Sequence, residues 1–127
     1  MTNQGKTVKS IYMTNTKKSG LARIIIFPEK KQFVAVCLDF DLIEEAKTRE
    51  EAEEQIKEAV VGYIQNVCKN NMEDKLLNRH APKKYWKMYE EYLKLIKTNK
   101  GRASFSKNTQ KSSLFTLPIN ELVGCGV

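Results

Sequence analysis

The stretch that decides the fold is ARIIIFPEKKQFVAVCLDFDLIEEA, residues 22–46. Residues 22–27 and 33–38 are rich in β-branched and other apolar side chains, and a short charged segment separates them. This pattern predicts two antiparallel strands joined as a hairpin. Pro28 has no N–H group to donate to a sheet, so the first strand is expected to end there. Residues 42–46 predict a shorter third strand.

The second of these strands, residues 33–38, is apolar on both faces. Its alternating sets are Phe33, Ala35 and Cys37 on one face and Val34, Val36 and Leu38 on the other. A strand buried on only one face would alternate apolar with polar residues. Each face of the sheet therefore needs a cover, and the second cover is expected from another helix, from a neighbouring subunit, or from both. A homodimer or higher oligomer is expected on this ground.

The first cover is an amphipathic helix predicted over residues 48–68. Thr48 and Glu51 fit a capping box, in which the threonine accepts from the amide of the glutamate and the carboxylate reaches back. Apolar side chains then recur every three or four residues, at Ala52, Ile56, Ala59, Val60, Tyr63, Ile64 and Val67. Charged side chains occupy the opposite face. This spacing predicts one buried stripe along the helix.

The second helix is predicted near residues 82–97, because the fixed φ of Pro82 suits a first helical turn. Its apolar stripe consists of Tyr85, Met88, Tyr89, Tyr92, Leu93 and Ile96. Aromatic rings between lysines could stack on nucleic-acid bases. A stripe on one helical face more often packs into a core, however, and packing is the expectation here.

The rest of the chain adds weaker elements to this plan. Residues 98–113 are polar, basic and rich in Ser and Asn, which predicts a loop. Residues 114–119 predict a last strand, and residues 7–13 are a further strand candidate. The whole chain, residues 1–127, is therefore expected to be a single α+β domain with a small antiparallel sheet.

Charge is unevenly distributed along this chain of net charge +7. Residues 39–58 carry nine carboxylates against three basic side chains, whereas both ends of the chain are basic. A basic protein could dock on the acidic segment, and the expected contact residues are Glu44, Glu45, Glu50, Glu53 and Glu54. RNA or DNA could instead bind the basic ends, chiefly through Lys100, Arg102, Lys107 and Lys111. Solvated faces without a charged partner are the third interpretation.

Catalytic patterns are weak in this sequence. Asp39 and Asp41 could hold a divalent metal ion for phosphodiester hydrolysis, but a pair of solvated loop acids is the expectation. His80, the one histidine, is expected to be an ordinary linker residue and not a general base. The three cysteines lack metal-site spacing and are expected to be reduced thiols. We therefore expect no enzyme activity, no metal ion and no cofactor.

Membrane and export signals are also missing from the sequence. The longest apolar run, which begins at Ile24, is far shorter than the ~20 residues needed to cross a bilayer. The first residues lead into no apolar segment of the kind that a secretory signal contains. A cytoplasmic protein without a membrane partner is expected.

The order of parts in residues 22–64 resembles the HicB-like antitoxin family. An apolar strand is followed by a short charged turn and by a second strand that ends in Cys-x-Asp, at Cys37 and Asp39. A short third strand follows, and then a Thr-x-Glu-Glu-Ala opening of an amphipathic helix at residues 48–52. The resemblance covers a core at about residues 20–70, and residues 71–127 form a helical, basic extension.

The resemblance implies a partial ribonuclease H fold, in which a helix backs a small antiparallel sheet. It also implies a protein partner, a basic HicA-like toxin that cleaves RNA, which the antitoxin neutralises by occlusion. Two features differ from the family pattern. The family commonly has an Asp-Leu-Pro-Gly-like turn where this chain has residues 39–42, DFDL. Many members also carry a C-terminal DNA-binding module, and this sequence shows no pattern of one.

Overall fold

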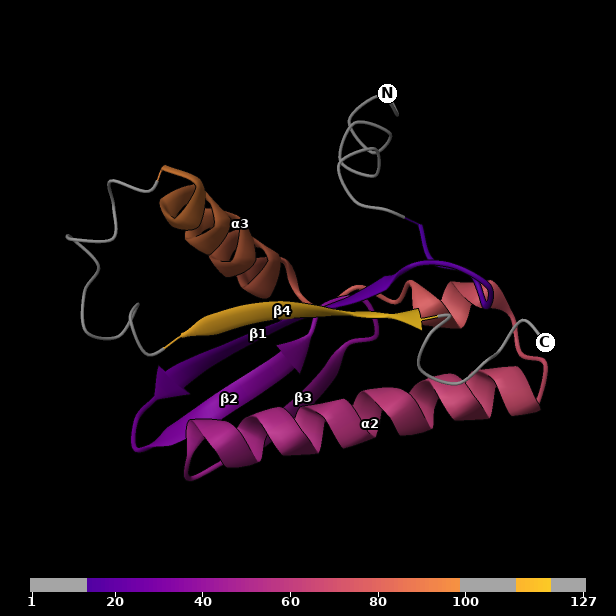
Figure 1. Cartoon of the computed structure of the whole chain (residues 1–127), viewed down its shortest axis with the longest axis horizontal. Helices are drawn as coiled ribbons and strands as arrows, with labels where there is room; N and C mark the ends of the chain where they lie inside the picture. Colours follow the sequence, from indigo (N-terminus) through magenta and orange to yellow (C-terminus); the bar gives the residue numbers. More distant parts are fainter. Residues whose placement is uncertain (1–13, 99–111, 120–127) are drawn as a thin grey trace.

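In the computed structural model, the described residues are 14–98 and 112–119, and they form one four-stranded sheet between two long helices (Figure 1). The elements in chain order are β1 (Leu21–Glu29), β2 (Gln32–Cys37), β3 (Leu42–Ala46), α2 (Arg49–Lys69), the 3-10 helix η1 (Asp74–Leu77), α3 (Lys83–Thr98) and β4 (Ser113–Pro118). The predicted α+β class is confirmed. The strand candidate at residues 7–13 lies outside the described residues.

The strands follow the order β3-β2-β1-β4, and each neighbouring pair is antiparallel. β1 and β2 form the predicted hairpin, in which Glu29 pairs with Gln32 across a two-residue turn. Lys30 opens that turn with a φ of 59°, and tight hairpin turns use such left-handed conformations. β4 pairs with β1, so the last predicted strand belongs to the same sheet as the first three.

Pro28 does not end β1, which corrects one expectation from the sequence. β1 continues to Glu29, and Pro28 pairs with Phe33 of β2. On the other side of β1, the pairing with β4 stops where Ile26 meets Ser113. Among the described residues Pro28 therefore pairs with β2 alone, a position that tolerates a proline.

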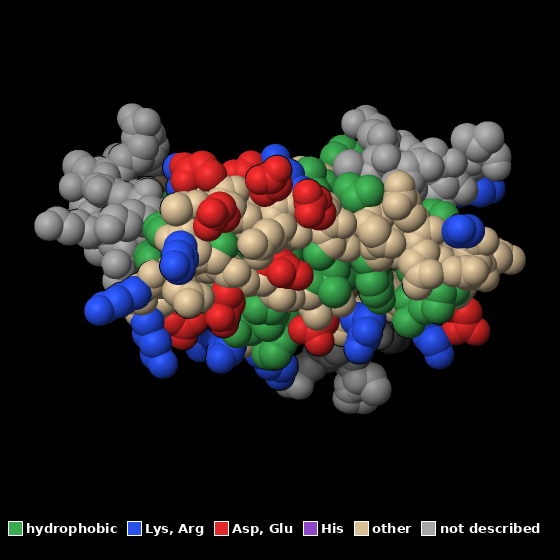
Figure 2. Space-filling model, turned by 90° about the horizontal axis from the view of Figure 1, so that it is seen from below, with side chains coloured by type: hydrophobic (Ala, Val, Ile, Leu, Met, Phe, Trp, Pro, Cys, Tyr) green, Lys and Arg blue, Asp and Glu red, His purple; other side chains and the backbone are tan. Residues whose placement is uncertain are grey.

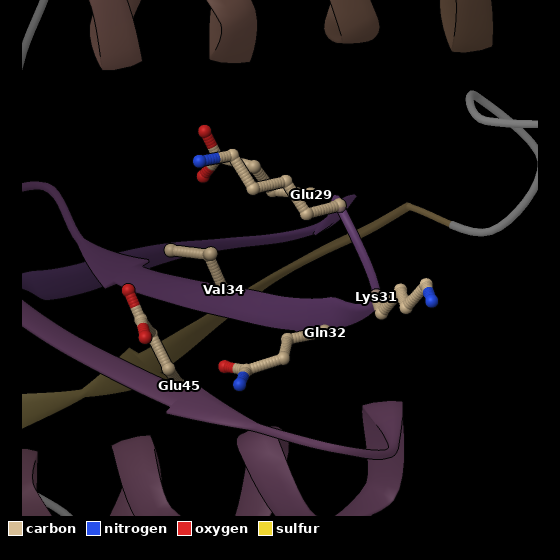
Figure 3. Close-up of a pocket in the computed structure, with 6 residues that line it drawn as sticks. Glu29, Lys31, Gln32, Val34 and Glu45 are labelled. Atoms are coloured by element: carbon tan, nitrogen blue, oxygen red, sulfur yellow. The ribbon is translucent and has the colours of Figure 1, made fainter.

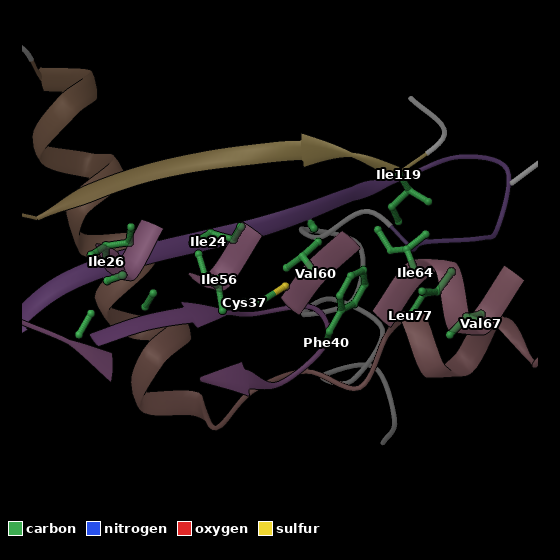
Figure 4. Close-up of a cluster of buried hydrophobic side chains, with 14 residues drawn as sticks. Ile24, Ile26, Cys37, Phe40, Ile56, Val60, Ile64, Val67, Leu77 and Ile119 are labelled. Carbon is green, nitrogen blue, oxygen red and sulfur yellow. The ribbon is translucent and has the colours of Figure 1, made fainter. Parts of the chain in front are cut away.

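The first face of the sheet is covered by α2, as predicted. Ile24 and Cys37 from the strands meet Ile56, Val60 and Ile64 from the helix, and all five are fully buried (Figure 4). The predicted apolar stripe is confirmed apart from Ala59, which is only half-buried and does not belong to this core. Burial of side chains of this size typically stabilises by ~1.5–3 kcal/mol each.

The second face is covered by α3, on the side of the sheet opposite α2 (Figure 1). Trp86 and Tyr89 from the helix pack with Val34, Val36 and Leu38, and all five are buried. The predicted cover of the second face is thus confirmed, and this chain supplies it. The homodimer or higher oligomer stays a prediction. The apolar face on which it was based is covered by α3 of the same chain, so that face no longer requires a second subunit.

The segment before β1 is anchored to the connection between the two helices. The side-chain amide of Asn15 donates to the carbonyl of Leu77 at 2.9 Å, and its oxygen accepts from the backbone N–H of Leu21 at 2.9 Å. Gly20 lies beside it with a φ of +141°. A Cβ at that position would overlap the side-chain oxygen of Asn15 and lie 2.8 Å from its Cγ, so glycine is required there.

Candidate protein-binding surface

Carboxylates gather on the outer face of α2 and on β3. We call this the acidic surface, and it consists of Glu44, Glu50, Glu51, Glu53, Glu54 and Glu58. Figure 2 views the molecule from the α2 side and shows carboxylates over one half of that face. Residues 42–58 carry seven carboxylates against three basic side chains. The acidic surface is therefore a local exception on a chain of net charge +7.

The start of α2 fixes where these carboxylates lie. The Thr48 hydroxyl accepts from the backbone N–H of Glu51 at 3.1 Å, which confirms the first half of the predicted capping box. The return contact from the Glu51 carboxylate is not among the hydrogen bonds of the described residues. Ala52 and Ile56 are fully buried against the sheet, so the glutamates between and around them are directed outwards.

Two members of the acidic surface are already paired within the helix. Glu53 forms an i,i+4 salt bridge with Lys57 at 2.8 Å, and Glu50 lies 3.4 Å from Arg49. No salt bridge to the other members is found among the described residues. Exposed pairs of this kind contribute little to stability, and the unpaired carboxylates remain accessible to an incoming cation.

The structure does not bring all five predicted contact residues together. Glu44 and Glu45 are consecutive in β3, so their side chains lie on opposite faces of the sheet. Glu44 lies on the α2 side with Ala46, whereas Glu45 pairs with Val34 on the α3 side. Figure 3 shows Glu45 and Val34 in a shallow hollow with Glu29, Lys31 and Gln32, near the tip of the β1–β2 hairpin.

A second hollow adds two carboxylates, Glu51 and Glu58, to the contact residues predicted from the sequence. Together with Glu54, Ala46 and Lys47 they line it at the boundary between α2 and the end of β3. The signal for them was present in the sequence, since these glutamates recur at spacings of three and four and therefore share one side of a helix.

The alternative nucleic-acid site cannot be placed. Its predicted residues, Lys100, Arg102, Lys107 and Lys111, lie outside the described residues. The aromatic rings of the preceding helix do lie within them. Trp86 and Tyr89 are buried against the sheet, so packing is confirmed for these two and they are not free to stack on bases.

Asp39 is not a solvated loop acid, which corrects another expectation. It is fully buried, and its two carboxylate oxygens accept from the backbone N–H of Arg23 at 2.8 Å and from its guanidinium at 2.6 Å. Burial raises the pKa of Asp39 to about 6, and the charge of Arg23 opposes the rise. The guanidinium also lies over the ring of Trp86, 5.6 Å from its centre. This ion pair is a structural element at the centre of the fold.

Asp41 is not part of the Arg23–Asp39 ion pair. It is exposed and adopts a φ of 60° in the turn between β2 and β3. The part of the chain that the structure describes contains no group of three or more side chains suited to hold a metal ion. A two-metal site needs several carboxylates around one position, and the described residues beside Asp41 do not supply them.

His80 is a linker residue, as expected. It is exposed between η1 and α3, its backbone N–H donates to the carbonyl of Asp39 at 3.1 Å, and its ring lies 5.5 Å from that of Trp86.

The cysteines differ from one another. Cys37 is a free, buried thiol whose pKa is raised to about 12 by burial, which makes it a poor nucleophile. Cys68 is half-buried near the end of α2, and Cys125 lies outside the described residues, so the expectation of reduced thiols stays a prediction for these two.

The fold and these contacts define a small α+β protein with an acidic surface on α2 and β3. Comparison with models of protein families, with curated proteins and with solved structures finds no match. The described helices include none with the length and apolar character that crossing a membrane requires. The HicB-like resemblance therefore rests on the order of strands and helix and on the residues that carry it.

Proposed function

We propose that this chain is a HicB-like antitoxin or a closely similar regulatory binding protein, and that it is not an enzyme. Its partner would be a basic protein that cleaves RNA, and the mechanism would be occlusion of the partner's RNA-binding face. The observation that carries the proposal is the acidic surface, which stands out on an otherwise basic chain. Complementary charges of this kind speed encounter and select against wrong partners.

Two further observations support the same proposal. The succession of β1, β2, β3 and α2 is the arrangement that the family resemblance implies, an antiparallel sheet backed by a helix. Asp39, the best carboxylate candidate for metal-dependent chemistry, is buried and paired with Arg23. Its carboxylate therefore has a structural role. Purified protein is expected to show no metal-dependent cleavage of RNA or DNA.

The test uses a small basic protein that cleaves RNA by itself, sought first among the products of the genes beside the one that encodes this chain; failure of the protein to suppress any such nuclease would contradict the proposal. The variant is Glu50→Lys with Glu54→Lys, which spares Glu53 and its salt bridge to Lys57. A matched control reverses Glu73 and Glu91, which are exposed and lie outside the acidic surface. Both variants change the net charge equally, so a difference between them reports position and not total charge.

Wild type and control are expected to suppress RNA cleavage equally. The Glu50/Glu54 variant is expected to bind at least about tenfold more slowly at low salt, because steering by surface charge acts on the association rate. The readouts are association rate by surface plasmon resonance and residual RNA cleavage, with circular dichroism as the check of folding. Equal binding by all three proteins would refute a role for the acidic surface.

A small RNA- or DNA-binding module is the second candidate function. Its support is the net charge of +7 and a row of exposed lysines on α3, namely Lys83, Lys84, Lys87 and Lys94. Neutralising Lys100, Arg102, Lys107 and Lys111 should then flatten the dependence of log affinity on log salt. Removal of one basic side chain that binds a phosphate should change that slope by roughly 0.7–0.9. Loss of nucleic-acid binding in this variant, with partner binding intact, would favour the second candidate.

A further inference from the structure

The outer edge of β3 is unpaired in the part of the chain that the structure describes. β3 ends the sheet on one side, and within residues 14–98 and 112–119 no strand pairs with its other edge. Its pairing with β2 runs through five consecutive residues without a bulge, from Phe33↔Ala46 to Cys37↔Leu42. An edge of this kind presents unpaired backbone N–H and C=O groups that can accept another strand.

The two edges of the sheet are protected differently. β4, at the far edge, ends in Pro118, which removes one backbone donor. β3 contains neither proline nor lysine, the two residues that most often prevent an edge strand from pairing with another chain. Its charged residues are Glu44 and Glu45 only, so its protection acts through negative charge. Such protection repels an acidic strand and attracts a basic one.

Side chains on both sides of this edge specify what an added strand would meet. On the α3 side it would meet Ile43, which is 44% exposed, and the exposed Glu45. On the α2 side it would meet Leu42, Glu44 and Ala46, with the carboxylates of the second hollow beyond them. Each side therefore offers an apolar contact next to a carboxylate.

A second copy of β3 is a poor occupant of this edge. Antiparallel self-pairing centred on Glu44 would place the two Glu44 side chains directly opposite each other and each Glu45 opposite Ile43. Like charges directly opposite destabilise a strand pair. The sequence of β3 thus favours a different strand, in which basic residues face Glu44 and Glu45 and apolar residues face the remaining positions.

We infer that β3 binds its partner by strand addition, and that the added strand carries two adjacent basic residues flanked by apolar ones. An antiparallel strand would read apolar, basic, basic, apolar, apolar, facing Ala46, Glu45, Glu44, Ile43 and Leu42 in turn. Main-chain hydrogen bonds supply affinity in this mode, and side-chain pairs supply specificity. This inference rests on the proposed function, because it states how the basic partner docks.

The test uses the unmodified protein and short peptides as probes. The parent peptide is acetyl-Gly-Val-Lys-Lys-Val-Val-Gly-amide, and a charge control carries Glu in place of both Lys. Two further peptides are N-methylated at alternate residues, one at each alternating set. In an extended strand the N–H groups of alternate residues point to the same side, so one methylated set blocks the paired edge and the other does not.

The parent peptide is expected to bind saturably and to shift the backbone amide resonances of residues 42–46. One N-methylated peptide should bind at least about tenfold more weakly and the other like the parent, because only one set loses main-chain hydrogen bonds. The Glu peptide should also bind at least about tenfold more weakly. Absence of parent binding, equal binding by both methylated peptides, or shifts confined to α2 would each overturn strand addition.

These outcomes separate the inference from the proposed function. If strand addition fails while the Glu50→Lys, Glu54→Lys variant still loses its toxin partner, the acidic surface docks that partner without β3. If the peptide binds β3 while no basic RNA-cleaving protein is suppressed, the edge is a strand-binding site and the antitoxin proposal is wrong.

Discussion

Raising the pH from about 4 to about 7 is expected to lower the free energy of unfolding, because Asp39 then ionises inside the fold. Burial raises its pKa from 3.8 to about 6, with the charge of Arg23 opposing the rise. The folded protein therefore holds this proton more tightly than the unfolded chain. The contribution is fully present below pH 3.8 and is lost as the pH rises through about 6. That pKa difference corresponds to ~3 kcal/mol, at ~1.4 kcal/mol for each tenfold change in proton affinity.

The assay is urea unfolding in small pH steps, followed by the fluorescence of Trp86, the one tryptophan. Asp39→Asn is the matched control, because it removes this titration and keeps every other ionisable group. The wild type should lose ~2 kcal/mol relative to the variant between pH 4 and pH 7, because part of the ~3 kcal/mol is already lost at pH 4. If the wild type instead gains stability relative to the variant as the pH rises, the attraction of Arg23 outweighs burial and the reasoning is refuted.

Two substitutions test the backbone and one tests the helix start, all by urea unfolding. Gly20→Ala should destabilise by more than ~1 kcal/mol, because its Cβ would overlap the Asn15 side chain and its φ is +141°. Gly62→Ala is the control within α2, where a Cβ has open space, and it should stabilise by ~0.5–1 kcal/mol. Equal effects of the two alanines would contradict the conformational argument. Thr48→Ala should cost ~1 kcal/mol through loss of the cap to Glu51, and no change would mean that the cap is replaced by water.

Most of the fold could be predicted because its signals are local. The β-branched runs of β1 and β2, the cap at Thr48 and the three- and four-residue spacing in α2 each depend on neighbours in sequence. The two apolar faces of β2 also predicted two covers. The missing N–H group of Pro28 predicted the end of β1, but the register with β2 carries the strand through Pro28 to Glu29.

The site was less predictable, because it depends on which side chains share a face. Consecutive glutamates look alike in sequence, yet Glu44 and Glu45 lie on opposite faces of the sheet. Asp39 looked like a loop acid because it directly follows the apolar run at residues 33–38. Its burial depends on Arg23, which is separated from it by sixteen positions and lies on a neighbouring strand. Only the antiparallel register brings the two together.

The carboxylates of β3 combine two effects that one variant pair can separate. Glu44 and Glu45 would oppose self-pairing of β3 by like-charge repulsion and would attract a basic strand to the same edge. Glu44→Gln with Glu45→Gln removes both charges and keeps the side-chain shape. Glu73→Gln with Glu91→Gln changes the net charge equally at exposed positions away from the edge.

The edge variant should therefore bind the Lys-Lys peptide more weakly than the control and also self-associate at lower protein concentration. Sedimentation velocity over a concentration series and peptide titration measure the two effects on the same samples. Weaker peptide binding without new self-association would mean that the charges attract a partner but do not guard the edge. Identical behaviour of the edge variant and the control in both assays would show that neither effect originates at β3.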